Sequence, residues 1–414
     1  MRALGRQFIL PFCVTALAML GACGTPARLP AVPVAEEEHP ITVDGMTGIR
    51  YWGDEATPEM INDGIDSFRR EVAARKAAGE SGPLPPVSYL AISGGGENGA
   101  FGAGLLVGWT AAGNRPSFKI VTGVSTGALI APFAFLGPAY DDKLKTVYTT
   151  ITDKDVLEER SFTAAIWNDA MADNAPLHKT VAKIFDQAML DAIAAEYAKG
   201  RLLLVGTTDL DARRPVIWNV TKIAASGSPN ALELVRQLLV ASAAIPGAFP
   251  PTMFDVEVDG KAYQEMHVDG GAASQVFIYP PNLNIAELSR GTNAGSRQRR
   301  VYVIRNARLD PDWSQVNRQT LSIAGRAVDS LIQTQGIGDL YRIYVQTQRD
   351  HIDFNLAYIP STFDVPLAHP FDTHYMNELF KVGYDLGAKG YPWAKLPPGY
   401  DTPMPTHKPL AQIN

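Results

Sequence analysis

The sequence predicts an α/β protein with a mostly parallel central sheet and helices on both faces. Val87 to Ile92 is a short apolar run, followed by a glycine cluster and a helical pattern that reaches about Gly113. Phe118 to Thr122 is a second apolar run, which leads through a Gly/Ser turn into the apolar helix Ala128 to Leu136. Two consecutive strand–turn–helix units are typical of a parallel sheet that is covered by helices.

Further elements are expected on both sides of these two units. An amphipathic helix over 57–79 is indicated by four apolar residues at helical spacing, namely Ile61, Ile65, Phe68 and Val72. Other helices are expected at 177–198, 229–244 and 320–348. The remaining strands are expected at Leu202–Thr207, Val216–Val220, His267–Asp269, Val301–Arg305 and His351–Ala357.

The composition is that of an ordinary globular protein. The chain has 414 residues, of which 46% are hydrophobic and 19% charged, and its formal net charge is -6. These values argue against a disordered chain and against the basic surface of a nucleic-acid-binding protein. We therefore expect no nucleic-acid partner.

The first residues have the pattern of an export signal. Arg2 and Arg6 precede a mostly apolar stretch, Phe8 to Leu20, which is too short to span a bilayer and leads through small residues to Cys23. A Cys at this point resembles a bacterial lipobox, whose Cys is lipidated and becomes the new N-terminus. The alternative is a plain signal peptide with a chance Cys. Cys13 is the other cysteine and lies in the removable part, so lipidation would leave the mature chain without a free thiol.

A G-x-S-x-G pattern spans Gly123 to Gly127 and places Ser125 between a strand and a helix. In such a turn the serine side chain projects above the sheet, and the two glycines are needed because a Cβ would clash in so sharp a bend. A helix start also directs backbone N–H groups toward developing negative charge. Ser125 is thus a candidate nucleophile, although a Gly/Ser-rich structural turn would show the same pattern.

A glycine run, Gly94 to Gly99, lies one strand–helix unit before Ser125. Successive N–H groups of Gly94, Gly95 and Gly96 could receive an oxyanion or a phosphate. The run also fits G-x-G-x-x-G, the dinucleotide pattern, but residues 103–118 contain no acid that could bind a ribose. Adjacent parallel strands would bring the glycine run and Ser125 to the same sheet edge, which favours the oxyanion interpretation.

Asp269 is the candidate general base. It stands at the end of a short strand, in His267-Val268-Asp269-Gly270-Gly271. Most Asp-Gly turns are structural. A buried carboxylate beside a serine hydroxyl could nevertheless take its proton, given a raised pKa.

Together these three motifs resemble the patatin-like phospholipases. That family is α/β in fold and uses a Ser–Asp dyad, a glycine-rich oxyanion loop, a G-x-S-x-G elbow and a downstream D-G-G or D-G-A. A fourth likeness is the stretch Ala241 to Pro251, which looks like the family's segment leading to the Asp strand. One departure is Asn98, which stands where the family's loop often carries a basic residue.

The resemblance implies a serine acyl hydrolase that acts on phospholipids or other lipid esters. Ser125 and Asp269 would be catalytic, Gly94, Gly95 and Gly96 would form the oxyanion hole, and Gly123 and Gly127 would shape the elbow. No cofactor is implied, and no metal is expected, because H-x-x-x-H and C-x-x-C patterns are absent.

Two alternatives remain open at this stage. One is a Ser-His-Asp esterase, in which His351, His369 or His374 would follow Asp269 in the chain order of α/β-hydrolases. The other is a lipid-binding envelope protein that kept the fold and lost catalysis.

The predicted organisation is a signal peptide over 1–22, a lipid anchor and tether over 23–56, and one hydrolase domain over 57–414 with its motifs at 87–271. Residues 24–40 contain four prolines and an acidic run, a composition that stays extended and solvated. Gly24 after Cys23 resembles lipoproteins sorted to the outer membrane. The expected location is therefore the bacterial cell envelope, with the protein anchored in the membrane through its lipidated N-terminus.

Overall fold

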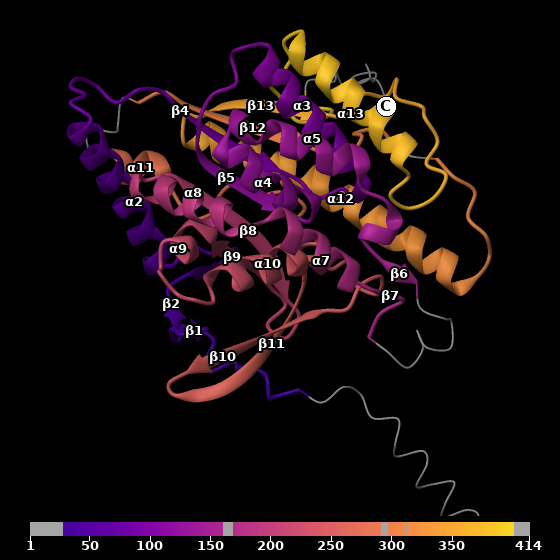
Figure 1. Ribbon diagram of the computed structural model, residues 1–414, viewed down its shortest axis with the longest axis horizontal. Coiled ribbons are helices and arrows are strands. Elements are labelled where there is room, and N and C mark those ends of the chain that lie inside the picture. Colours follow the sequence, from indigo (N-terminus) through magenta and orange to yellow (C-terminus); the bar gives the residue numbers. More distant parts are fainter. Residues whose placement is uncertain (1–27, 160–168, 291–296, 312, 401–414) are drawn as a thin grey trace, which may run out of the picture.

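The computed structural model describes residues 28–159, 169–290, 297–311 and 313–400, which form a large mixed sheet with helices on both faces (Figure 1). The predicted signal peptide and Cys23 lie outside these residues. Five neighbouring strands are parallel and follow the order β13-β12-β4-β5-β8. Their bounds are Val87–Ile92 (β4), Phe118–Val124 (β5), Leu202–Asp209 (β8), Arg299–Arg305 (β12) and Asp353–Tyr358 (β13).

The other half of the sheet is antiparallel, so the prediction of a mostly parallel sheet is wrong there. Short turns join β8 to β9 and β10 to β11, and strands joined by short turns can only pair antiparallel. The turn between β10 and β11 is Asp259-Gly260, both with positive φ, which is a typical hairpin turn. The antiparallel strands are Ile41–Val43 (β1), Met46–Thr47 (β2), Arg50–Trp52 (β3), Arg214–Asn219 (β9), Thr252–Val258 (β10) and Lys261–Asp269 (β11).

Strands β1 to β3 correct the predicted tether. Residues 41–43 pair with β10 and residues 50–52 pair with β9, so the end of the 23–56 segment belongs to the central sheet. The stretch before them also contacts the body: Arg28 forms an ion pair with Asp211, and Gln264 N–H donates to the carbonyl of Pro30. These strands have only two or three residues each, so their apolar pattern is too short to predict a strand after a proline-rich stretch.

Helices cover the sheet on both sides because its strands alternate apolar side chains between two faces. On one face, Leu90 and Ile92 of β4 join a core with α3, α4, α8, α10 and α13. On the other face, Tyr89 and Ala91 pack with α12. Bounds on the first face are Gly99–Ala111 (α3), Thr126–Leu136 (α4), Asp141–Thr150 (α5), Ala175–Ile184 (α7), Gln187–Ala198 (α8), Val220–Ala224 (α9), Ala231–Ser242 (α10) and Thr373–Ala388 (α13).

The remaining elements complete the periphery. The long helix α12, Thr320–Arg349, extends past the body of the protein (orange in Figure 1). The helices Pro58–Ala77 (α2) and Ile285–Arg290 (α11) and the short strands Glu158–Glu159 (β6) and Ala172–Asp173 (β7) lie at the edges. The predicted helix 177–198 is two helices, because Asp186 accepts a hydrogen bond from Met189 N–H and starts α8 afresh. Within the described ranges, no helix is both long enough and apolar enough to cross a membrane.

Candidate active site

Ser125 occupies the sharp turn between β5 and α4. Its backbone has φ 54° and ψ -127°, a conformation that costs a non-glycine residue about 1–3 kcal/mol. Two kinds of hydrogen bond hold it there. The N–H of Ser125 donates to Ser242 Oγ at 3.0 Å, and its carbonyl accepts from Ala128 N–H at 2.8 Å in the first turn of α4.

The two glycines of the elbow are required by close backbone approach. A Cβ on Gly123 would overlap the carbonyl of Gly127, and a Cβ on Gly127 would overlap the carbonyl of Ile92 at the end of β4. The turn can therefore close only where both positions lack a side chain. The same packing brings the end of β4, and the glycine run that follows it, against Ser125.

Asp269 lies beside Ser125 because their two strands, β11 and β5, pair with the same edge of β8. Gly206 of β8 pairs with Val124 and with Ile217, and the next residue, Thr207, pairs with Asp269 and with Val216. Since β9 occupies one edge of β8 throughout, β5 and β11 must meet end to end on the other edge. The residue that follows Val124 is thereby placed beside Asp269.

The carboxyl of Asp269 is buried and lies close to the hydroxyl of Ser125. Gly271 N–H donates to Asp269 Oδ1 at 2.7 Å. Burial raises the pKa of Asp269 to about 6, although the nearby Ser125 hydroxyl and the Gly271 N–H act to lower it. A carboxylate with such a pKa is ionised at neutral pH and can still accept a proton from a serine during reaction.

Gly94 does not offer the N–H that the sequence predicted. Its N–H donates to the carbonyl of Gln275 at 3.1 Å, so Gly94 serves as the wall of the site, with Ser125 Cβ 3.2 Å from where its own Cβ would be. Within the described part of the chain, the N–H groups of Gly95 and Gly96 donate to no protein acceptor. Both have positive φ, and a Cβ on Gly95 would overlap the carbonyl of Asn306. These two donors, with those at the start of α4, can receive an oxyanion.

The rest of the glycine loop carries no cation. Asn98 accepts a hydrogen bond from Tyr375 of α13 at 2.6 Å through its side-chain oxygen. Burial raises the pKa of the neighbouring Glu97 carboxyl. The loop therefore offers a negative charge only backbone dipoles and no side-chain cation.

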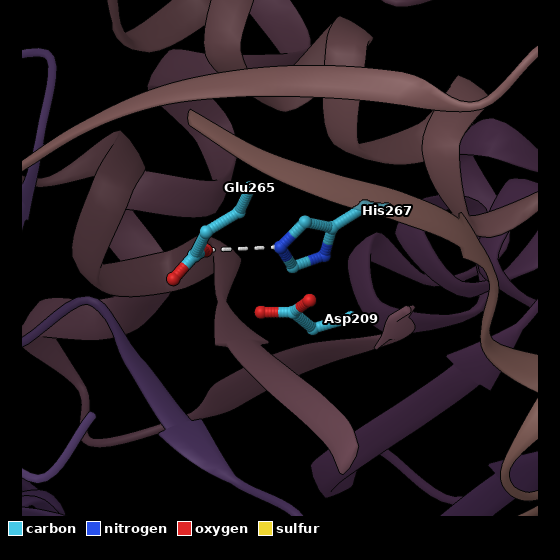
Figure 2. A group of neighbouring side chains, drawn as sticks. All are labelled: Asp209, Glu265 and His267. Carbon is cyan, nitrogen blue, oxygen red and sulfur yellow. Dashed lines mark hydrogen bonds and ion pairs between the residues drawn. The ribbon is translucent and has the colours of Figure 1, made fainter. Parts of the chain in front are cut away.

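His267 lies in a buried polar cluster with Asp209 and Glu265 (Figure 2). Its Nε2 lies 3.0 Å from Glu265 Oε2 and its Nδ1 lies 2.9 Å from Thr207 Oγ1, so both ring nitrogens are engaged. Among the described histidines, none has a hydrogen bond with Ser125 or Asp269, and His351, His369 and His374 are exposed. The arrangement does not favour a Ser-His-Asp triad.

Asp209, Glu265 and His267 present ligand atoms within 4.8 Å of one another, which sequence spacing did not reveal. Glu265 is already paired with Arg50, whose Nη2 lies 2.8 Å from Glu265 Oε1. Burial alone would raise the pKa of Glu265, but Arg50 and His267 outweigh it and lower the pKa to about 2. Asp209 accepts from the N–H of Asp211 at 2.8 Å. These contacts describe a buried ion-pair network that fixes β11 against β8 and β3.

Two residues that position the site had no assigned role in the sequence. Ser242 Oγ accepts from Ser125 N–H and donates to the carbonyl of Gly206 at 2.6 Å. The carbonyl of Ala244 accepts from Asp269 N–H at 2.9 Å. Both lie in the stretch Ala241 to Pro251, and only the fold reveals that this one segment holds the backbones of both candidate catalytic residues.

Comparison with known proteins finds similarity in the central part of the chain. No curated protein matches in sequence. The crystal structure of VipD from Legionella pneumophila is similar over 74% of this chain and 66% of that chain, with 12% identity and a TM-score of 0.35. This chain therefore spans about two thirds of the length of that protein. Residues 90–281, which hold the serine elbow, the glycine loop and the Asp269 turn, match the model of the patatin-like phospholipase family.

Proposed function

We propose that this protein is a serine acyl hydrolase that cleaves carboxylic esters of phospholipids or other lipids through Ser125 and Asp269. The observation that carries the proposal is the placement of Ser125, through the strand ends at Val124 and Asp269, beside a buried carboxyl whose pKa is raised to about 6. The match of residues 90–281 to the patatin-like phospholipase family supports a lipid ester as substrate.

In the first half of the proposed reaction, Ser125 Oγ attacks the ester carbonyl while its proton passes to Asp269. The carbonyl oxygen becomes an oxyanion within reach of the N–H groups of Gly95 and Gly96. Collapse of this intermediate breaks the ester C–O bond, and the leaving alkoxide takes the proton from Asp269. The products are an acyl-enzyme and a free alcohol.

In the second half, Asp269 accepts a proton from water as the water oxygen attacks the acyl carbonyl. The same N–H groups face the second oxyanion. Its collapse breaks the bond to Ser125 Oγ, which recovers its proton from Asp269, and the fatty acid leaves. The chemistry needs no group beyond these side chains, the backbone donors and water.

We also propose that Cys23 is lipidated and holds the enzyme in the bacterial outer membrane, beside its substrate. The support is the apolar signal segment and the Cys that follows small residues. Radiolabelled palmitate should be incorporated into the wild-type protein and not into C23S. The anchor would be refuted if the wild-type protein kept the mass of the unmodified chain and the membrane fraction contained no label.

Labelling with a fluorophosphonate separates an enzyme from a lipid-binding protein of the same fold, because only an activated serine reacts quickly. The wild-type protein and S81A, which alters an exposed serine, should be labelled and should hydrolyse a p-nitrophenyl ester. S125A should be neither labelled by the fluorophosphonate nor able to hydrolyse the ester. Rapid labelling of S125A, or full turnover by it, would refute the proposed nucleophile.

A further inference from the structure

Arg305, at the end of β12, is a buried cation without a carboxylate partner. The residue is 2% exposed, and its Nη2 donates to Gln333 Oε1 at 2.9 Å. Within the described ranges, no Asp or Glu lies within ion-pair distance of the guanidinium, and Nε has no hydrogen-bond partner. Burial lowers the pKa of Arg305 to about 10, with no opposing charge to raise it.

The fold makes room for this side chain at a cost. Helix α12 crosses above Arg305 at Gly336, where a Cβ would overlap the guanidinium nitrogens. A glycine inside a helix destabilises it relative to alanine, and an unpaired buried charge is unfavourable as well. An uncharged side chain at 305 would avoid the cost of the unpaired buried charge. This combination is typical of a site that keeps a charge for a ligand.

Arg305 lies at the sheet edge that carries the candidate catalytic residues. Ile304 pairs with Ile92, and the next residue after Arg305, Asn306, places its carbonyl against Gly95. Asn306 also donates two hydrogen bonds to Ser93, from its N–H to Ser93 Oγ and from its side-chain amide to the Ser93 carbonyl, both at 2.9 Å. Arg305 therefore ends the strand beside the one that leads into the glycine loop, and its guanidinium lies against Gly336 of α12.

We propose that Arg305 binds the phosphate of a phospholipid substrate while its ester lies at Ser125, an inference that rests on the proposed function. A planar guanidinium presents several donors in a fork that matches phosphate oxygens. Gln333 is half-buried, and its amide oxygen accepts the hydrogen bond from Arg305 that a phosphate oxygen would accept in the proposed complex. In the proposed complex the Gln333 side chain moves aside and a phosphate oxygen replaces its amide oxygen.

The test compares two lipids that carry the same acyl esters, dioctanoyl phosphatidylcholine and dioctanoylglycerol, in micelles of one neutral detergent. The readout is the ratio of kcat/KM for the phospholipid to kcat/KM for the diacylglycerol. R305Q should lower this ratio by about 10- to 100-fold, the effect of losing a charged hydrogen bond to phosphate. R305K should lower it less. R318Q removes the same charge from an exposed position of the neighbouring segment and should leave the ratio unchanged.

Thermal unfolding provides a second measurement. Because R305Q removes an unpaired buried charge, its Tm should equal or exceed that of the wild type, and millimolar inorganic phosphate should raise the Tm of the wild type more than that of R305Q. If phosphate left the Tm unchanged while R305Q still lost kcat/KM selectively for the phospholipid, Arg305 would be shown to bind phosphate only as part of the whole lipid. An unchanged ratio in R305Q, or a much lower Tm, would overturn the role of Arg305. A wild type that hydrolyses neither lipid would instead refute the proposed function.

Discussion

Replacement of Asp269 by asparagine should remove activity and at the same time stabilise the protein at neutral pH. The carboxyl is buried beneath Ser125, and its ionised form is therefore disfavoured by the fold itself. An asparagine has nearly the same shape, can accept the hydrogen bond from Gly271 N–H and can donate to Ser125 Oγ. The substitution thus removes the charge and leaves the contacts in place.

The size of the effect follows from the pKa of Asp269, which is about 6 in the folded protein and 3.8 for an unperturbed carboxyl. Because the folded value is the higher one, the folded state binds the proton more tightly, and the free energy of unfolding falls as pH rises between the two values. One pKa unit is worth about 1.4 kcal/mol, so the ionised carboxyl costs roughly 3 kcal/mol above about pH 7 and roughly 0.5 kcal/mol near pH 4.

Urea unfolding of wild type and D269N at neutral pH and near pH 4 measures this difference. D269N should be more stable at neutral pH by up to about 3 kcal/mol, and the two proteins should converge in acid. The variant should hydrolyse no p-nitrophenyl ester in either condition. If D269N were less stable than the wild type at neutral pH, the carboxylate would be a stabilising partner in the fold, and its role as a strained general base would be refuted.

Three further predictions concern the same site. The kcat/KM for a p-nitrophenyl ester should rise with pH through about 6 and be about tenfold lower at pH 5 than on its plateau, because Asp269 must be ionised; a flat profile over this range would contradict the assignment. S242A should lose roughly 2–5 kcal/mol of stability, as two buried backbone groups lose their partner, and should lower kcat more than it changes KM, with S81A as control. H267Q should be destabilised but retain turnover, and a loss of activity comparable to that of S125A would point to a catalytic histidine.

The motifs could be predicted from sequence because each one depends on local backbone geometry. Gly123 and Gly127 are needed wherever a strand turns at once into a helix, and an apolar run such as Val87 to Ile92 marks a strand buried on both faces. The structure confirms the strand Val87–Ile92 at both ends, and the strand at 118–122 extends two residues further. Local rules of this kind hold without knowledge of the tertiary fold.

The features of the fold and of the site that the sequence did not predict depend mainly on contacts between distant segments. Strands β1 and β3 are three residues each and gain their stability from pairing with β10 and β9, so their short runs carry no signal of their own. The hairpin β10–β11 does carry such a signal, since Asp259-Gly260 stands between alternating apolar residues. Gly94 could not be excluded as an oxyanion donor from sequence, because its acceptor, Gln275, is far along the chain.

The meeting of β5 and β11 on one edge of β8 also explains why the site needs the segment from Ser242 to Ala244. Two strand ends that abut without pairing with each other have no shared ladder to fix their separation, so the distance from Ser125 to Asp269 must be set from outside. Ser242 Oγ binds the N–H of Ser125 and the Ala244 carbonyl binds the N–H of Asp269, and Ser242 is tied in turn to Gly206 of β8. The end of α10 and the two residues after it therefore set the separation of the two candidate catalytic groups, while β8 provides the base to which all three segments are bound.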